Sequence, residues 1–284
     1  MIISVFAGLN AMPENLPMIS SGQMTALPLK FDHYGQGSPL VILHGLLGSR
    51  QNWRAVAVKL KNSFSVYVPD LRNHGTSPHH DSFGYDEMAE DIKCFLQEHV
   101  DVPATLIGHS MGGKLAMRLA AMFPDMIANL IVIDIAPKNY MPIEKPILAA
   151  LLSLELEAYS RSETIFNDLA TTIPDAALRY FLLKNIVRDK AGRYHWRIHL
   201  KAIHDSYQNI CTDPAIQRAT GVRTLFVRGE RSNFIEDEDL TAIRSLFPQS
   251  RVETVANAGH WVHIDAPEAT CAVIKQFVNP HISS

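Results

Sequence analysis

The 284-residue sequence contains little cysteine, no excess of basic residues and no long apolar segment. Its three cysteines, Cys94, Cys211 and Cys271, are widely spaced and form no C-x-x-C pair, which argues against a disulfide framework and against a zinc site. The 26 Lys and Arg residues against 29 Asp and Glu give a formal net charge of −3, which argues against nucleic acid as a partner. No apolar run approaches the ~18 residues of a membrane span, so no membrane partner is expected.

The N-terminal segment carries no Lys or Arg before Lys30, so the positively charged region of a secretory signal is missing. Together with the cysteine pattern, this predicts a protein of the reducing cytoplasm. Residues 1–24 are expected to form an extension to the folded part of the chain. The hydrophobic fraction of 47% is typical of a globular protein with a substantial core.

Short apolar runs that end in turn residues recur in the first half of the chain, at 40–43, 65–68, 104–107 and 130–133. Runs of four apolar residues without alternation are typical of parallel strands that are buried on both faces. Amphipathic helices are predicted between them over 86–98 and 111–122. The strand pattern returns at 224–229 and 252–255, and a last helix is predicted over 267–277. This alternation predicts an α/β protein with a mostly parallel, doubly wound sheet.

Between these two halves the apolar pattern is helical throughout, from Pro142 to about Thr212. We therefore predict a core formed by residues 25–138 and 213–284, interrupted by a helical insertion over 139–212. An insertion above the carboxyl ends of the strands would form a lid.

The sequence Gly108-His109-Ser110-Met111-Gly112 fits the G-x-S-x-G motif, and it lies directly between a predicted strand and a predicted helix. A sharp strand-to-helix turn holds the serine in a strained conformation and leaves no room for neighbouring Cβ atoms. Ser110 is the predicted nucleophile.

A serine nucleophile needs donors for the oxyanion that develops during attack. The backbone amides of Leu46, in the loop after an earlier strand, and Met111, at the start of the next helix, are the predicted donors. His44 is expected to shape the loop rather than to take part in the chemistry.

A general base is expected in the loop after the last strand, because that loop returns to the edge of the sheet where Ser110 lies. His260, in Ala258-Gly259-His260-Trp261, is the predicted base, and His263 is the weaker candidate. No metal and no cofactor are expected, since no metal-ligand cluster competes for these residues.

The acid requires a choice between two positions. In most proteins of this architecture the acid lies in the loop after the strand at 224–229, about three residues after its final glycine. Here that position is Ser232, followed by Asn233, and neither side chain can carry a negative charge. Asp134 follows the strand after the nucleophile and has apolar neighbours, where a carboxylate needs a partner. We predict Asp134 as the acid, with Glu230 or another acid of that loop as the alternative.

Two further predictions concern the surroundings of the site. Asp70 and Arg72, in a loop after a strand, are expected to form a structural ion pair. Five aromatic residues are candidate pocket walls, the alternative being that they belong to the core: Trp53, Trp261, Phe181, Trp196 and Tyr207.

From about Thr25 to Asn279 the chain resembles the α/β hydrolases, and more narrowly the YbfF-type esterases, the bacterial relatives of mammalian abhydrolase domain-containing protein 11. The motifs that carry the resemblance are His44-Gly45-Leu46-Leu47-Gly48-Ser49, Asp70-Leu71-Arg72-Asn73-His74-Gly75, Gly108-His109-Ser110-Met111-Gly112-Gly113-Lys114, Ile133-Asp134-Ile135-Ala136-Pro137 and Ala258-Gly259-His260-Trp261-Val262-His263. The resemblance implies the α/β-hydrolase fold, an acid at Asp134, and carboxylesterase activity on short- to medium-chain acyl esters.

The expected activity is therefore hydrolysis of a small-molecule ester through an acyl-enzyme on Ser110. An acyl-CoA thioesterase and a carbon–carbon bond hydrolase of the same fold remain alternatives, as does a ligand receptor built on a hydrolase scaffold. Neither the physiological substrate nor the oligomeric state follows from the sequence.

Overall fold

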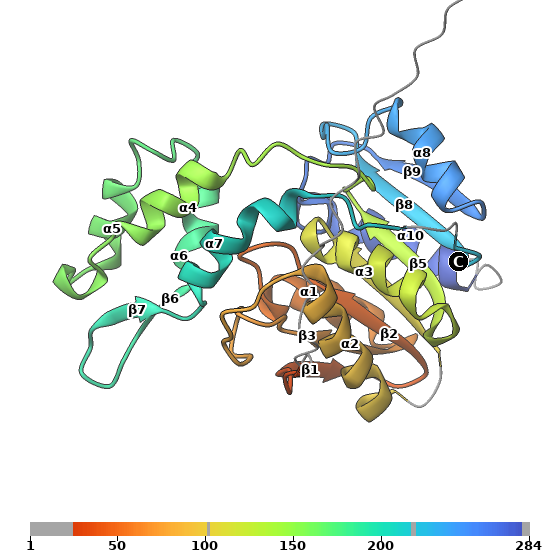
Figure 1. Cartoon of the computed structure of the whole chain (residues 1–284), viewed down its shortest axis with the longest axis horizontal. Helices are drawn as coiled ribbons and strands as arrows, with labels where there is room; N and C mark the ends of the chain where they lie inside the picture. Colours follow the sequence, from red (N-terminus) through yellow and green to blue (C-terminus); the bar gives the residue numbers. More distant parts are fainter. Residues whose placement is uncertain (1–24, 101–102, 217–219, 280–284) are drawn as a thin grey trace, which may run out of the picture.

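The computed structural model describes residues 25–100, 103–216 and 220–279 (Figure 1). The predicted N-terminal extension, residues 1–24, lies outside the described residues. A seven-stranded sheet has the order β1-β3-β2-β4-β5-β8-β9, in which β1 is antiparallel to β3 and the other neighbouring strands are parallel. The strands are β1 Phe31–Tyr34, β2 Ser38–Leu43, β3 Phe64–Pro69, β4 Ala104–His109, β5 Ile127–Ile133, β8 Thr224–Gly229 and β9 Ser250–Val255. The predicted α/β class with a mostly parallel sheet is confirmed.

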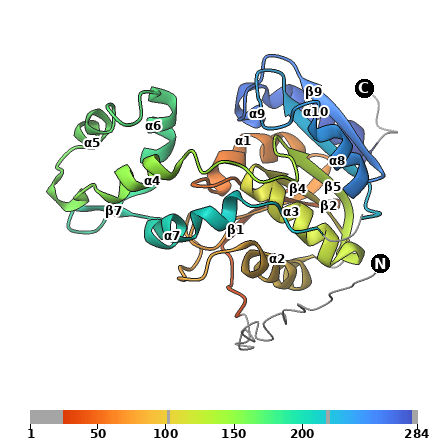
Figure 2. The same ribbon diagram turned by 45° about the horizontal axis from the view of Figure 1, so that its top comes forward.

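Helices cover both faces of the sheet (Figures 1 and 2). One layer contains α1 and α10, which contact each other, and the opposite layer contains α2 and α3. The helices are α1 Arg50–Leu60, α2 Tyr85–His99, α3 Met111–Met122, α4 Lys145–Leu152, α5 Ser162–Asp168, α6 Ala176–Leu183, α7 Leu200–Cys211, α8 Asp239–Leu246, α9 Val262–Asp265 and α10 Pro267–Val278. Within the described residues, no helix is long and apolar enough to cross a membrane.

The strand β2 shows why its apolar run does not alternate. Leu40 and Ile42 belong to the core on the α1 and α10 side, whereas Val41 and Leu43 belong to the core on the α2 and α3 side. All four side chains are fully buried. A strand covered on both faces needs apolar residues at every position, which is the pattern seen in the sequence.

The inserted segment, residues 139–212, contains α4 to α7 and lies to one side of the sheet (Figures 1 and 2). The prediction that it is helical throughout is wrong, because β6 (Ile186–Arg188) and β7 (Tyr194–Trp196) form an antiparallel hairpin. Asp189 closes the turn by accepting hydrogen bonds from the amides of Ala191 and Arg193, at 2.8 and 2.9 Å. Gly192 supplies the positive φ of 83° that such a turn requires.

The carboxyl ends of the central strands meet at one edge of the sheet. The first residues beyond β4 and β5 still bond to the next strand: the Ser110 amide donates to the Ile133 carbonyl, at 3.1 Å, and the Asp134 amide donates to the Val227 carbonyl, at 2.8 Å. The loops that follow these strands therefore begin side by side, and the sheet itself brings distant parts of the sequence together.

Candidate active site

Ser110 occupies the sharp turn between β4 and α3, with φ 52° and ψ −121°. This is a strained conformation for a residue with a side chain. A Cβ atom at Gly108 would lie 2.1 Å from the Gly112 carbonyl oxygen, and one at Gly112 would lie 2.4 Å from the Leu43 carbonyl oxygen. Glycine is thus required on both sides of Ser110, as the motif predicts, and the half-buried serine lies above the edge of the sheet.

Asp134 and His260 are in direct contact, although 126 residues separate them in the sequence. The Nδ1 of His260 lies 2.8 Å from Oδ2 of Asp134, and the aspartate side chain is fully buried. The Gly229 amide donates to Oδ1 of Asp134 at 3.0 Å, and the Ser232 hydroxyl donates to Oδ2. Among the described residues, the donors to this carboxylate therefore come from the last residue of β8 and from the loops after β8 and β9.

The alternative acid, Glu230, is directed elsewhere. Its exposed side chain accepts a hydrogen bond from the backbone amide of Asn257, at 2.8 Å. The geometry thus pairs His260 with Asp134 and leaves Glu230 in a structural role at the surface.

The backbone and the ring of His260 are both held by neighbouring aromatic side chains. The Phe234 ring stacks on the His260 ring with a centroid distance of 3.8 Å and an interplanar angle of 20°. His109 donates from Nε2 to the His260 carbonyl at 2.8 Å. Burial holds the pKa of His109 well below its usual range, so its ring is neutral and one nitrogen carries the donated proton.

The predicted oxyanion donors lie beside Ser110. Leu46 and Met111 both line a cavity that Ser110 also lines. In the part of the chain that the structure describes, neither backbone N–H has a hydrogen-bond acceptor within the protein. A Cβ atom at Gly45 would lie 3.3 Å from the Ser110 Cβ, so glycine lets this loop approach the serine closely.

His44 ties two loops together, as predicted for a residue that shapes the loop. Its Nδ1 donates to the Gly45 carbonyl at 2.9 Å, and its Nε2 accepts from the Leu71 amide at 3.0 Å. Both ring nitrogens are used by the backbone, so His44 holds the loop that carries Leu46.

The predicted ion pair between Asp70 and Arg72 is wrong, because each residue pairs with a partner on a helix. Asp70 forms an ion pair with Arg50, and Arg72 forms one with Asp91, with 2.6 Å between Nε and Oδ2. Arg72 and Asp91 are almost completely buried. A buried ion pair offsets the cost of desolvation only if the two groups are well aligned and hydrogen-bonded. The loop is thus fastened to α1 and α2 instead of to itself.

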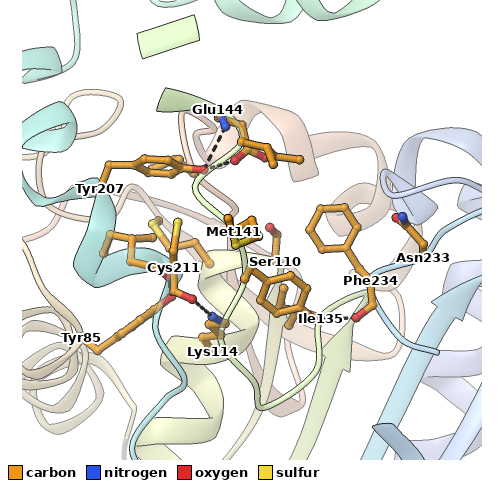
Figure 3. A pocket seen from close by; sticks show the side chains of 15 residues that line it. Tyr85, Ser110, Lys114, Ile135, Met141, Glu144, Tyr207, Cys211, Asn233 and Phe234 are labelled. Carbon is orange, nitrogen blue, oxygen red and sulfur yellow. Dashed lines mark hydrogen bonds between the residues drawn. The ribbon is translucent and has the colours of Figure 1, made fainter. Parts of the chain in front are cut away.

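Two cavities meet at Ser110. Chamber A, of about 230 Å³, is lined by the charged side chains Lys114 and Glu144 and by several hydroxyl-bearing side chains, Tyr207 among them (Figure 3). Chamber B, of about 270 Å³, is lined by His260 and by the apolar residues Leu178, Phe181, Leu182 and Trp261, among others. Five residues line both chambers: Leu46, Ser110, Ile143, Glu144 and Phe234.

The five aromatic candidates for pocket walls are divided by the structure. Trp53, Phe181 and Trp261 line chamber B, and Tyr207 lines chamber A. Trp196, on β7, lines neither of these two chambers, because the hairpin that carries it packs against the core of the inserted segment. Trp53 is fully buried and stacks on His263, with a centroid distance of 4.0 Å.

Four residues of the site were not predicted as such from the sequence. Ser232 is unsuitable as an acid, but its hydroxyl group can donate a hydrogen bond to one. Phe234 and Glu144 lie near Ser110 only because of the tertiary fold, and no local pattern marks them, whereas Lys114 lies one helical turn after Ser110 on α3. Among the described residues, no group of three or more His, Cys, Asp or Glu side chains could hold a metal ion.

Comparisons with known proteins agree with this fold. A family model described as "alpha/beta hydrolase fold" matches residues 38–267. The sn-1-specific diacylglycerol lipase ABHD11 of Mus musculus is 35% identical over 274 residues, which cover 91% of this chain and 89% of that protein. Esterase YbfF of Escherichia coli (strain K12) is 34% identical over 244 residues, which cover 85% of this chain and 93% of that protein.

A solved structure of a marine microorganism esterase superposes with a TM-score of 0.86 at 40% sequence identity, and the match covers 89% of this chain and 100% of that one. These relatives confirm the resemblance predicted from the motifs. The chain belongs to the alpha/beta hydrolase fold family.

Proposed function

We propose that the protein is a serine carboxylesterase that hydrolyses short- to medium-chain carboxylic esters. The observation that carries this proposal is the hydrogen bond between His260 and the buried Asp134, formed beside a strained Ser110 that borders two cavities. In such a site the acid orients the histidine, and the histidine acts as the base that activates the serine hydroxyl for acyl transfer.

In the proposed reaction, His260 takes the proton of Ser110 while the serine oxygen attacks the ester carbonyl. The Leu46 and Met111 amides stabilise the resulting oxyanion, and the dipole of α3 adds to this at its N-terminus. His260 then gives its proton to the leaving alcohol. Water, activated by the same histidine, attacks the acyl-enzyme and releases the acid.

Asp134 keeps the Nδ1 proton of His260 in place, so that Nε2 is free to act on the serine. Residues 139–212 act as a lid, because α4, α6 and α7 contribute walls to the two chambers. Large apolar walls favour apolar acyl or alcohol groups. The free thiols of Cys94, Cys211 and Cys271 support a location in the reducing cytoplasm.

The decisive experiment compares the wild type with Ser110→Ala on p-nitrophenyl butyrate. Removal of the nucleophile should lower kcat on the order of 10⁵-fold or more. Ser153→Ala, which changes an exposed serine of the inserted segment, is the matched control and should retain full activity. A fluorophosphonate probe should label the wild type and fail to label Ser110→Ala. Full esterase activity in Ser110→Ala would exclude the proposed mechanism.

A panel of esters and acyl-CoA thioesters of graded chain length then separates an esterase from a thioesterase. The proposal expects higher kcat/KM for the oxygen esters at every chain length. A consistent preference for the thioesters would replace the esterase by a thioesterase while leaving the roles of the three residues unchanged.

A further inference from the structure

Glu144 lies at the junction of the two chambers. It precedes α4 in the inserted segment and borders both chambers together with Ser110. The other residues shared by the chambers, Leu46, Ile143 and Phe234, are apolar. A carboxyl group in this position meets any substrate that reaches the serine.

Tyr207, on α7, fixes the orientation of this carboxyl group. The Tyr207 hydroxyl donates to Oε2 of Glu144, and the Glu144 amide donates back to the same hydroxyl oxygen at 3.3 Å. The tyrosine is only 3% exposed. Each carboxylate oxygen has two lone pairs, so Glu144 can accept a further hydrogen bond from a ligand. Burial raises the pKa of Glu144, and the nearby His260 acts in the opposite direction.

Chamber A also contains one buried cation. The Lys114 amine, 2% exposed, donates to the carbonyls of Cys211 and Thr212 at 3.0 and 2.5 Å and lies 4.7 Å from the centre of the Tyr140 ring. Burial lowers its pKa to about 8, so it is still mostly protonated at neutral pH. Figure 3 shows the two charged groups apart, with the Tyr207 ring beside Glu144 and the Cys211 carbonyl against Lys114.

A substrate anion that approaches Glu144 is repelled by the carboxylate, and the Lys114 amine already donates to two backbone carbonyls. A neutral hydroxyl group can donate to the Glu144 carboxylate without this repulsion. A hydrogen bond to a charged acceptor is stronger than a neutral one, and more so where apolar walls exclude water.

The position of His260 indicates which half of an ester occupies chamber A. His260 lines chamber B and is not among the residues that line chamber A. Because the histidine must give its proton to the leaving alcohol oxygen, the alcohol part is expected on the side of chamber B. The acyl part then extends into chamber A, toward Glu144.

We propose that Glu144, positioned by Tyr207, is a specificity-determining residue that selects acyl groups carrying a neutral hydroxyl substituent. This assignment rests on the proposed esterase function. It concerns the choice of substrate, since the proton transfers need only Ser110, Asp134 and His260.

The test measures kcat/KM for ethyl butyrate, ethyl 3-hydroxybutyrate and ethyl 3-methoxybutyrate. The ratio of hydroxy ester to plain ester should be at least about tenfold higher in the wild type than in Glu144→Met, because the apolar variant cannot accept the hydrogen bond. Glu144→Gln keeps an acceptor oxygen and should restore part of the ratio. Tyr207→Phe, which releases the carboxyl group, should give an intermediate ratio. The methoxy ester has no proton to donate and should show no preference in any variant.

The ratio of two kcat/KM values from one preparation does not depend on the fraction of active enzyme, so a less stable variant still answers the question. Glu157→Met, at an exposed position of the same inserted segment, is the matched control and should keep the wild-type ratio. An unchanged ratio in both Glu144→Met and Tyr207→Phe overturns the assignment.

A second pair of substrates, 2-hydroxyethyl butyrate and 2-methoxyethyl butyrate, carries the substituent on the alcohol. The assignment to the acyl part is also overturned if the wild type prefers the hydroxy ester only in this second pair and Glu144→Met abolishes that preference. If the wild type hydrolyses none of these esters, the proposed function itself fails, and this assignment fails with it.

Discussion

The Ser232 hydroxyl donates a hydrogen bond to Oδ2 of Asp134, the same carboxylate oxygen that contacts Nδ1 of His260. Ser232 lies in the loop after β8, and the amide of Gly229, the last residue of β8, donates to the other carboxylate oxygen. Asp134 itself has φ 52°, a conformation that its surroundings must maintain. The loop after β8 therefore fixes the acid from outside its own strand.

Replacing Ser232 by Ala should lower kcat about three- to tenfold, in line with the loss of one hydrogen bond to a buried carboxylate. The loss is limited because the Gly229 amide and His260 still hold Asp134. Ser232→Thr keeps the hydroxyl and is the control. Steady-state kinetics on p-nitrophenyl butyrate provide the measurement, and equal losses in the Ala and Thr variants would mean that side-chain volume matters instead of the hydrogen bond.

Asp134→Asn should lower kcat on the order of 10⁴-fold, by analogy with the same change in serine proteases, because an amide no longer holds the histidine in the productive tautomer. Glu230→Gln should have little effect, since the Glu230 side chain is exposed and accepts a hydrogen bond from the backbone amide of Asn257 at the surface. The two variants are compared in one assay. A large effect at Glu230 with a small one at Asp134 would transfer the role of the acid.

The features of the fold and of the site that could be predicted from the sequence are those that depend on neighbouring residues in the chain. The buried parallel strands are visible as apolar runs because both of their faces are covered. Asp134 could be predicted because a carboxylate between isoleucines needs a partner. The antiparallel edge strand β1, Phe31–Tyr34, was missed, since its half-exposed residues form no apolar run.

The remaining features depend on contacts between segments that are far apart in the sequence. Arg72 pairs with Asp91 and not with Asp70, and Glu144 meets Tyr207 across 63 residues. Neither pairing leaves a local pattern. The hairpin at β6 and β7 was missed for a different reason: its strands have three residues each, too short for a period of two to be distinguished from a helical one.

The glycines of the turn at Ser110 provide a stability prediction. Gly112→Ala should strongly destabilise the fold or inactivate the protein, because the new Cβ would lie 2.4 Å from the Leu43 carbonyl oxygen, and this backbone cannot move without disturbing the sheet. Gly221→Ala is the matched control: it places the same methyl group where none of the described residues has an atom within 4 Å, at a position without a positive φ. It should be neutral or stabilise by about 0.4–1 kcal/mol through the unfolded state.

Urea unfolding at neutral pH measures both glycine variants. Equal midpoints for Gly112→Ala and the wild type would show that the turn can relax to accept a side chain next to the Leu43 carbonyl.

His263 provides a prediction about acid stability. Its ring is 4% exposed, stacks on Trp53 at an interplanar angle of 9°, and has an Nδ1 without a hydrogen-bond partner among the described residues. Burial, helped by the neighbouring His260, lowers the pKa of His263 to about 3. The folded protein therefore keeps this ring neutral at pH values where the unfolded chain, with a histidine pKa near 6.5, takes up a proton.

The direction of the effect follows from proton uptake. The stability that the neutral ring contributes is fully present above pH 6.5 and is lost as the pH falls from about 6.5 toward about 3. Between these values the unfolded state binds one more proton than the folded state, so the free energy of unfolding decreases by up to about 1.4 kcal/mol per pH unit.

His263→Phe keeps the stacked ring and removes the titration. The slope of the unfolding free energy between pH 6 and pH 4 should therefore be smaller in this variant than in the wild type by up to about 1.4 kcal/mol per pH unit. The difference between the two proteins reports the titration of His263 together with its influence on His109, whose pKa the neighbouring His263 also lowers. The exposed His80, replaced by Gln, is the control and should leave the slope as in the wild type. Parallel pH profiles for the wild type and His263→Phe would show that the ring is protonated in the folded state.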